Sequence, residues 1–135
     1  MIPDSEIWLR LVLATIAGGF IGLEREVVHK PAGVRTHMLV CLGSAIFIII
    51  VLQSIPLDMA GSALAGITTG IGFLGAGTIF KTKSEVQGLT TAASIWAVAS
   101  VGLAVGLGYY LLTSISVVLI LLILHLNKLE FFRNL

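Results

Sequence analysis

Charged and polar side chains are concentrated in one short stretch of an otherwise apolar chain. We call this stretch, residues 24–37, the polar rim; it contains Glu24, Arg25, Glu26, His29, Lys30, Arg35, Thr36 and His37. Carboxylates beside guanidinium and ammonium groups form ion pairs, and such cations also bind phosphate headgroups or acidic partners. We expect a structural ion pair between Arg35 and Glu24 or Glu26. A contact surface for a partner protein or an anionic lipid headgroup is the alternative.

A metal site is a further alternative for the polar rim, because Glu24, Glu26, His29 and His37 offer oxygen and nitrogen ligands. Mg²⁺ prefers carboxylates and retained waters, but these two carboxylates already have cationic neighbours in the sequence. We therefore expect no cofactor, and Mg²⁺ binding has no support from the pattern. The sequence also shows no Ser/His/Asp set and no paired carboxylates within an apolar segment, so we expect no enzymatic activity.

The composition of the whole chain indicates its class. Hydrophobic residues make up 57% of the 135 residues and charged residues 11%, and the mean hydropathy is +1.07. Soluble domains average about 25% charged residues, whereas a disordered chain would contain far fewer aliphatic residues. The net charge of +1 does not favour nucleic acid as a partner, and the single Cys41 excludes an internal disulfide. An integral membrane protein in contact with the lipid bilayer remains.

Five apolar segments are long enough to cross a bilayer, which takes roughly 17 to 25 residues. The sequence thus predicts an all-α integral membrane protein with a single transmembrane domain over residues 1–135. Gly106 and Gly108 must break the last apolar run, because one continuous helix would be about 57 Å long, nearly twice the hydrocarbon core. Thr90 or Thr91 is expected to cap the fourth helix. The expected helices cover residues 7–23, 37–55, 59–80, 89–106 and 109–126.

Lysine and arginine residues predict the orientation of the chain in the membrane. Cytoplasmic loops carry an excess of these residues, so we predict an outer amino terminus and a cytoplasmic carboxy terminus. Arg10 is the exception on the outer side, where we expect it to snorkel to the headgroups. The residues expected on the cytoplasmic side are Arg25, Lys30, Arg35, Lys81, Lys83, Lys128 and Arg133.

The fifteen glycines are spaced for close helix packing. Small residues four positions apart let helix backbones approach closely in a membrane. We expect the first, third and fourth helices to form the packed centre, the fifth to face lipid, and a leucine at Gly70 or Gly75 to break the fold. Lining of a polar path by the third helix is the alternative. The glycines with one of these two expected roles are Gly18, Gly22, Gly66, Gly70, Gly72, Gly75, Gly77, Gly102 and Gly106.

Two pairs of short segments resemble each other at a nearly constant distance along the chain. Residues 19–22 resemble residues 72–75, and residues 33–36 resemble residues 88–91, at offsets of 53 and 55. The pattern is typical of a parallel repeat of two helical hairpins. With so few matched residues, it fits a repeat and a coincidence alike.

Four segments of the chain resemble the MgtC/SapB family of bacterial membrane proteins. They are residues 17–26 (AGGFIGLERE), 32–40 (AGVRTHMLV), 70–79 (GIGFLGAGTI) and 88–96 (GLTTAASIW). The resemblance implies a five-helix protein of the bacterial inner membrane with a link to magnesium homeostasis and adaptation to low Mg²⁺. It also implies that five residues of the polar rim matter, namely Glu24, Arg25, Arg35, Thr36 and His37.

Some members of this family are virulence factors that act on the rotary ATP synthase rather than moving Mg²⁺ themselves. Those members carry a soluble domain after the fifth helix, whereas residues 127–135 alone follow here. The sequence therefore fits a short form of the family or a piece of a longer protein, and a virulence-related role stays an open alternative. The predicted function is that of a non-enzymatic, homo-oligomeric protein acting through contacts with other inner-membrane proteins. The alternatives are a small oligomeric cation transporter or channel lined by the third helix, and a structural subunit of a larger complex.

Overall fold

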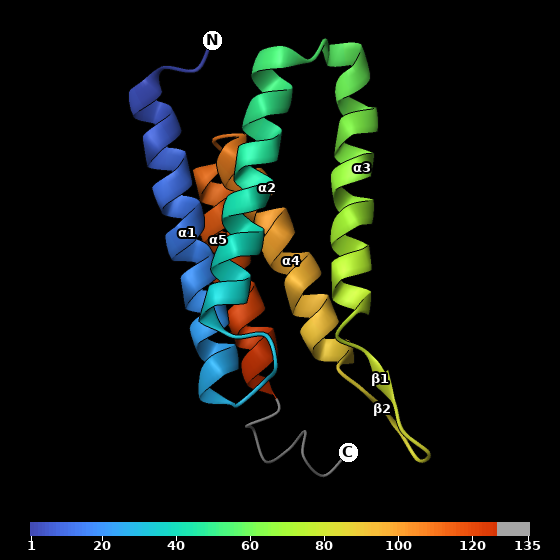
Figure 1. Ribbon diagram of the computed structural model, residues 1–135. Coiled ribbons are helices and arrows are strands. Elements are labelled where there is room, and N and C mark those ends of the chain that lie inside the picture. Colours follow the sequence, from blue (N-terminus) through green and yellow to red (C-terminus); the bar gives the residue numbers. More distant parts are fainter. Residues whose placement is uncertain (127–135) are drawn as a thin grey trace.

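The computed structural model describes residues 1–126, which form five helices and one short β-hairpin (Figure 1). The prediction of five helices is confirmed, and four of them, α1 to α4, are long and apolar enough to cross a membrane. Lys128 and Arg133, which contribute to the predicted orientation, lie outside the described residues, and the orientation stays a prediction. The elements are α1 (Asp4–Val27), α2 (Val34–Ser54), α3 (Leu57–Ala76), β1 (Phe80–Lys81), β2 (Val86–Gln87), α4 (Leu89–Gly106) and α5 (Tyr110–His125).

The predicted helix ends are wrong mainly where polar residues or glycines adjoin an apolar run. The start of the polar rim is itself helical, because α1 continues to Val27. Conversely, α3 ends at Ala76 rather than at Phe80. Phe80 belongs to β1, which pairs antiparallel with β2 in a hairpin that leads to α4. Hydropathy alone did not reveal this hairpin, since Ile79 and Phe80 extend the apolar run past the glycines that end the helix.

The backbone at the end of α1 turns the chain back towards α2. His29 has a φ of 56°, in the left-handed region. The amides of His29 and Lys30 donate to the carbonyls of Glu26 and Arg25, each at 3.0 Å. This hydrogen-bond pattern is typical of helices that end in a left-handed residue. It places the loop of residues 28–33 beside the end of α1 and the start of α2, so the polar rim forms a tight turn between these two helices.

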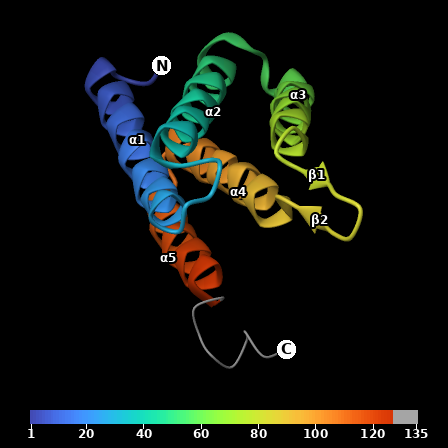
Figure 2. The same ribbon diagram turned by 60° about the horizontal axis from the view of Figure 1, so that its bottom comes forward.

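Helix α2, and not α3, occupies the packed centre together with α1 and α4. The two most extensive helix contacts are those of α2 with α1 and of α2 with α4. In both Figure 1 and Figure 2, α3 stands apart from α1 and α5, on the far side of α2. The expectation that the third helix belongs to the packed centre is therefore wrong. The buried core consists mainly of small and β-branched side chains, among them Ala14, Ala17, Ile21, Cys41, Ala45, Val98, Val101 and Val105.

The glycines of α1 and α4 explain how these helices approach α2 so closely. A Cβ atom on Gly18 would lie 2.6 Å from the carbonyl oxygen of His37, and one on Gly22 would lie 2.7 Å from the Cα atom of Val34. On α4, a Cβ atom on Gly102 or Gly106 would overlap atoms of α2. These four glycines therefore have the packing role that their spacing predicts.

Most glycines of α3 make no such contact. A Cβ atom on Gly66, Gly70 or Gly72 would meet no described atom within 4 Å beyond the neighbouring backbone of its own helix. Gly75 is buried, and its Cβ would lie 3.2 Å from the carbonyl oxygen of Ala92; Gly77 lies beyond the end of the helix. The expected fold-breaking effect of Gly70→Leu thus has no basis within one chain. A glycine permits close approach but adds no apolar surface, so its spacing alone does not identify the partner helix.

The outer face of α5 agrees with the expectation of a lipid-facing helix. Only Thr113 and Leu124 of α5 are buried. Its exposed large apolar side chains are Leu111, Leu112, Ile115, Val118, Leu119, Leu122 and Ile123.

Arg10 does not reach outwards to the headgroups as expected. Its Nε donates to Glu6 Oε1 at 3.0 Å, and its Nη1 donates to the carbonyl oxygen of Gly106 at 2.7 Å. The guanidinium thus satisfies a carbonyl at the carboxy-terminal end of α4, where a cation is favourable. Tyr110 also donates to Glu6, so this cluster joins the start of α1 to the α4–α5 turn.

Candidate functional site at the polar rim

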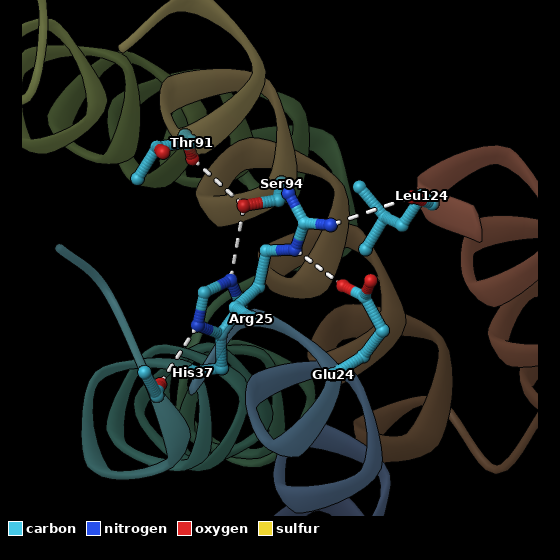
Figure 3. A network of polar contacts seen from close by, with 7 residues as sticks. Glu24, Arg25, His37, Thr91, Ser94 and Leu124 are labelled. Atoms are coloured by element: carbon cyan, nitrogen blue, oxygen red, sulfur yellow. Dashed lines mark hydrogen bonds and ion pairs between the residues drawn. The ribbon is translucent and has the colours of Figure 1, made fainter. Parts of the chain in front are cut away.

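Four helices meet at the polar rim, where α1 and α5 end and α2 and α4 begin. Figure 3 shows the polar contacts among them: His37 of α2 is directed towards Ser94 of α4, and Arg25 of α1 contacts Glu24 of the same helix and Leu124 of α5. Arg25, His37 and Ser94 are all buried. Because buried polar groups are costly unless they are paired, the partners of these side chains define the site.

His37 and Ser94 connect α2 to α4 through a buried hydrogen-bond chain. The His37 ring is fully buried; its Nδ1 lies 2.9 Å from the carbonyl oxygen of Gly33, and its Nε2 lies 3.0 Å from Ser94 Oγ. Since a carbonyl only accepts, Nδ1 must carry a proton. The Ser94 hydroxyl also lies 2.8 Å from the carbonyl oxygen of Thr91, to which it can donate.

The hydrogen-bond chain of His37, Ser94 and the Thr91 carbonyl has two arrangements that differ by one proton. When Ser94 donates to Thr91, Nε2 of His37 can bond to Ser94 only as an N–H group, which makes the ring an imidazolium. When the ring is neutral, the single Ser94 proton goes to Nε2 instead, and the Thr91 carbonyl loses that donor. The His37–Ser94–Thr91 hydrogen-bond chain can therefore hold a proton between α2 and α4. Because His37 and Ser94 are buried, neither presents a nucleophile to a substrate.

Arg25 and Glu24 form the charged half of the site. Nε of Arg25 donates to Glu24 Oε2 at 2.5 Å, and Nη2 lies 3.4 Å from the carbonyl oxygen of Leu124 on α5. The Arg25 side chain is 4% exposed and that of Glu24 is 11% exposed. The second carboxylate oxygen, Glu24 Oε1, is buried and has no hydrogen-bond partner. The pair balances its own charge but leaves one acceptor unsatisfied.

The predicted ion pair of Arg35 with Glu24 or Glu26 is wrong. Arg35 is exposed and forms no ion pair within residues 1–126, while Arg25 pairs with Glu24. Positions two apart on a helix point about 200° apart, so Arg35 faces outwards because His37 faces inwards.

The remaining rim residues have separate surroundings. Glu26 Oε2 accepts a hydrogen bond from the Val34 amide at 2.8 Å, which places a carboxylate at the amino-terminal end of α2, where it is favourable. Thr36 is half-buried, and its hydroxyl makes no hydrogen bond to a described side chain or backbone group. The set of possible metal ligands is not brought together: residues 1–126 contain no group of three or more His, Cys, Asp or Glu side chains that could hold a metal ion.

Two contributors to the site were not singled out from the sequence. Ser94 and the carbonyl group of Leu124 complete the contacts of His37 and Arg25. Thr91 does not cap α4 as expected; the N-cap is Gly88, and no side chain caps this helix end. The three-residue spacing of Thr91 and Ser94, which puts both on one face of a helix, is the signal that would have indicated a polar contact inside the bundle.

A pocket of about 770 Å³ opens beside this site. We call it the rim pocket. It lies between the loop after α1, the β1–β2 hairpin and the start of α4, and its polar lining comes chiefly from Glu24, Arg25, His29, Lys30, Gln87 and Thr90. A second space, the α2–α3 groove, has a volume of about 680 Å³ and an almost wholly apolar lining.

Comparisons with known proteins agree with the resemblance of the four sequence segments. Over 130 residues the chain is 42% identical to the putative magnesium transporter YhiD of Escherichia coli K12, which covers 90% of this chain and 60% of that protein. It is 43% identical over 102 residues to protein MgtC of Salmonella typhimurium LT2, with 76% and 44% covered, and 40% identical over 141 residues to protein SrpB of Synechococcus elongatus, with 91% and 77% covered.

The chain therefore spans less than two thirds of the length of YhiD and of MgtC. No solved structure matches it. The sequence pattern of the MgtC family matches residues 11–131, nearly the whole chain. This match and the identity to three relatives show that the chain belongs to the MgtC family.

Proposed function

We propose that this protein serves magnesium homeostasis in the bacterial inner membrane without enzymatic activity, by contacting other membrane proteins. Membership of the MgtC family and the likeness to a putative magnesium transporter support the link to Mg²⁺. The apolar helices support a place in the membrane. The observation that carries the contact role is the exposed α2–α3 groove.

The α2–α3 groove offers a surface for a helix of another protein. Gly66 and Gly70 on α3 and Gly43 on α2 line it, and a Cβ atom on any of them would meet no described atom within 4 Å beyond the neighbouring backbone of its own helix. Ser44, 2% exposed, also lines the groove. Small residues are the surfaces on which membrane helices pack, because lipid provides no hydrophobic drive between helices. The groove therefore fits a transmembrane helix of a partner, or of a second copy in a homo-oligomer.

Site-specific crosslinking tests the contact role. A photoreactive residue at position 70, inside the groove, should give a discrete protein adduct in cells grown at low Mg²⁺. The same residue at position 119, on the exposed face of α5, is the matched control and should not. Protein adducts at neither position, or at both equally, would contradict a partner in the groove.

A small oligomeric cation transporter is the second candidate. It is favoured by the open backbone at Gly66 and Gly70, which could line a path between copies of the chain. Against it, the lining of the groove is almost wholly apolar. Purified protein in liposomes containing a Mg²⁺ indicator should show no more uptake than empty liposomes. Uptake that Gly70→Leu blocks would instead support the transporter.

A further inference from the structure

The rim pocket combines a cationic side, an unsatisfied anionic group and apolar walls. Lys30 and His29 line it from the loop after α1. Both side chains are exposed, so they are available to a ligand. Within residues 1–126 neither forms an ion pair.

The start of α4 adds hydrogen-bond donors to the cationic side. Gly88, Leu89, Thr90 and Thr91 line the rim pocket, and no side chain caps this end of the helix. The first amides of a helix have no partner within the helix, and together with the helix dipole they favour a phosphate group. Gly88 makes the arrangement feasible: its φ is 88°, and a Cβ atom there would overlap the carbonyl oxygen of Thr78.

Glu24 favours a positively charged hydrogen-bond donor in the same pocket, in contrast to the groups that favour a phosphate. Its Oε1 is buried without a hydrogen-bond partner, although Glu24 lines the pocket and its Oε2 is paired with Arg25. A buried acceptor without a donor costs about 1 to 3 kcal/mol, and more for a charged group. Inorganic phosphate or an anionic headgroup can offer this oxygen at most a neutral hydroxyl, and it brings a further negative charge beside the carboxylate. An ammonium group supplies a positively charged donor instead, once the carboxylate turns towards the pocket.

We propose that the rim pocket binds a phosphoethanolamine headgroup. Its phosphate would bind Lys30, His29 and the amides at the start of α4, and its ammonium would bind Glu24. Val28, Leu89 and Leu124 also line the pocket, and the pocket lies at the ends of membrane-spanning helices. These apolar walls favour a phospholipid over a soluble phosphoethanolamine compound, because they can cover the glycerol and the first methylenes of the acyl chains.

Native mass spectrometry in detergent with equal amounts of phosphatidylethanolamine and phosphatidylglycerol tests the proposal. The wild type should retain phosphatidylethanolamine about tenfold better, a difference of about 1.4 kcal/mol. Glu24→Gln should remove this preference and leave phosphatidylglycerol retention unchanged. Lys30→Ala should weaken retention of both lipids. Lys83→Ala, on the exposed turn of the hairpin, is the matched control and should change neither.

Three results would overturn the proposal. They are equal retention of the two lipids by the wild type, retention of neither, and an unchanged preference in folded Glu24→Gln. If Glu24→Gln does not fold, the wild-type preference and the Lys30→Ala variant decide. Soluble glycerophosphoethanolamine is the final arm: displacement of the lipid at equal concentration would show that the soluble compound, and not the lipid, is the ligand.

Discussion

His37 is the most enclosed polar side chain of the polar rim, and each of its ring nitrogens has one partner. The partner of Nε2, Ser94 Oγ, comes from another helix, so the contact joins α2 to α4. Removal of this hydroxyl by Ser94→Ala leaves a buried nitrogen without a partner. We expect a loss of about 1 to 3 kcal/mol in the free energy of unfolding, measured by thermal unfolding in detergent.

Ser100→Ala is the matched control for this change. Its hydroxyl donates to the Trp96 carbonyl on an exposed face of the same helix, so the expected change is within about 0.5 kcal/mol. Equal effects of the two substitutions would mean that the His37–Ser94 contact does not stabilise the bundle.

Arg25 and Arg35 differ in their surroundings and should differ in their effects. Arg25→Ala removes the partner of a buried carboxylate, which should cost about 3 kcal/mol or more. Arg35 is exposed, so Arg35→Ala should change the unfolding free energy by no more than about 0.5 kcal/mol. Both variants should be followed by melting temperature and by growth at low Mg²⁺. A large stability loss in Arg35→Ala would contradict the observed pairing, while lost growth at normal stability would assign Arg35 to a partner or lipid.

Among the elements, α4 and α3 carry similar glycine patterns with different consequences. A leucine at Gly102 would overlap the backbone of α2, and overpacking costs about 1 to 3 kcal/mol or more. At Gly70 the added Cβ meets no atom of another element within 4 Å, and the side chain enters the α2–α3 groove, so this leucine should leave the melting temperature nearly unchanged. Thermal unfolding of the two variants in the same detergent compares them directly. A similar loss in both would mean that α3 packs within the chain more closely than the structure shows.

The loop after α1 contains one residue, His29, whose backbone conformation is strained. His29 adopts a positive φ, a conformation that costs roughly 1 kcal/mol for residues other than glycine. We expect His29→Gly to raise the unfolding free energy by about 0.5 to 1 kcal/mol. His29→Ala, which also removes the imidazole but keeps the strain, separates this effect from loss of the side chain. If His29→Gly were less stable than His29→Ala, the positive φ at position 29 would not be a source of strain.

The sequence predicts those features of the helices and the hairpin that depend on neighbouring residues. It does not predict those that depend on contacts between residues far apart in the sequence. The helices follow from apolar length. The break between α2, which ends at Ser54, and α3 follows from Pro56, the N-cap of α3, because proline has no amide hydrogen to continue a helix. The hairpin after α3 and the choice of Arg25 as the buried cation depend on contacts between distant segments. Glu24 and Arg35 are close in sequence, yet the direction of each side chain is set by which helix faces pack together.

The proposed repeat of two hairpins stays a prediction, and one pair of contacts supports it. Gly22 approaches His37 at the first hairpin, and Gly75 approaches Ala92 at the second. Offsets of 53 and 55 residues relate these positions, as they relate the resembling sequence segments. The two hairpins nevertheless pack to different extents, since α1 contacts α2 much more extensively than α3 contacts α4.

At the scale of the whole molecule, α1, α2 and α4 form a close-packed unit, while α3 adds a largely exposed helix to it. The polar rim closes one end of this unit, and the cluster of Arg10 and Glu6 closes the other. We therefore expect substitutions at the glycine contacts of this unit to destabilise the fold, and substitutions in the α2–α3 groove to leave it intact. Under the proposed function, this groove is where the protein meets its partner.

Growth at low Mg²⁺ of cells that depend on Gly70→Leu protein tests this account most directly. The Cβ atom of this leucine meets no atom of another element within 4 Å, and its side chain enters the α2–α3 groove. The account therefore predicts a normal melting temperature and normal amounts in the membrane together with lost growth. Leu119→Ala, on the exposed face of α5, should grow as the wild type does. Full growth with Gly70→Leu, at normal protein levels, would contradict a role of the groove in partner contact.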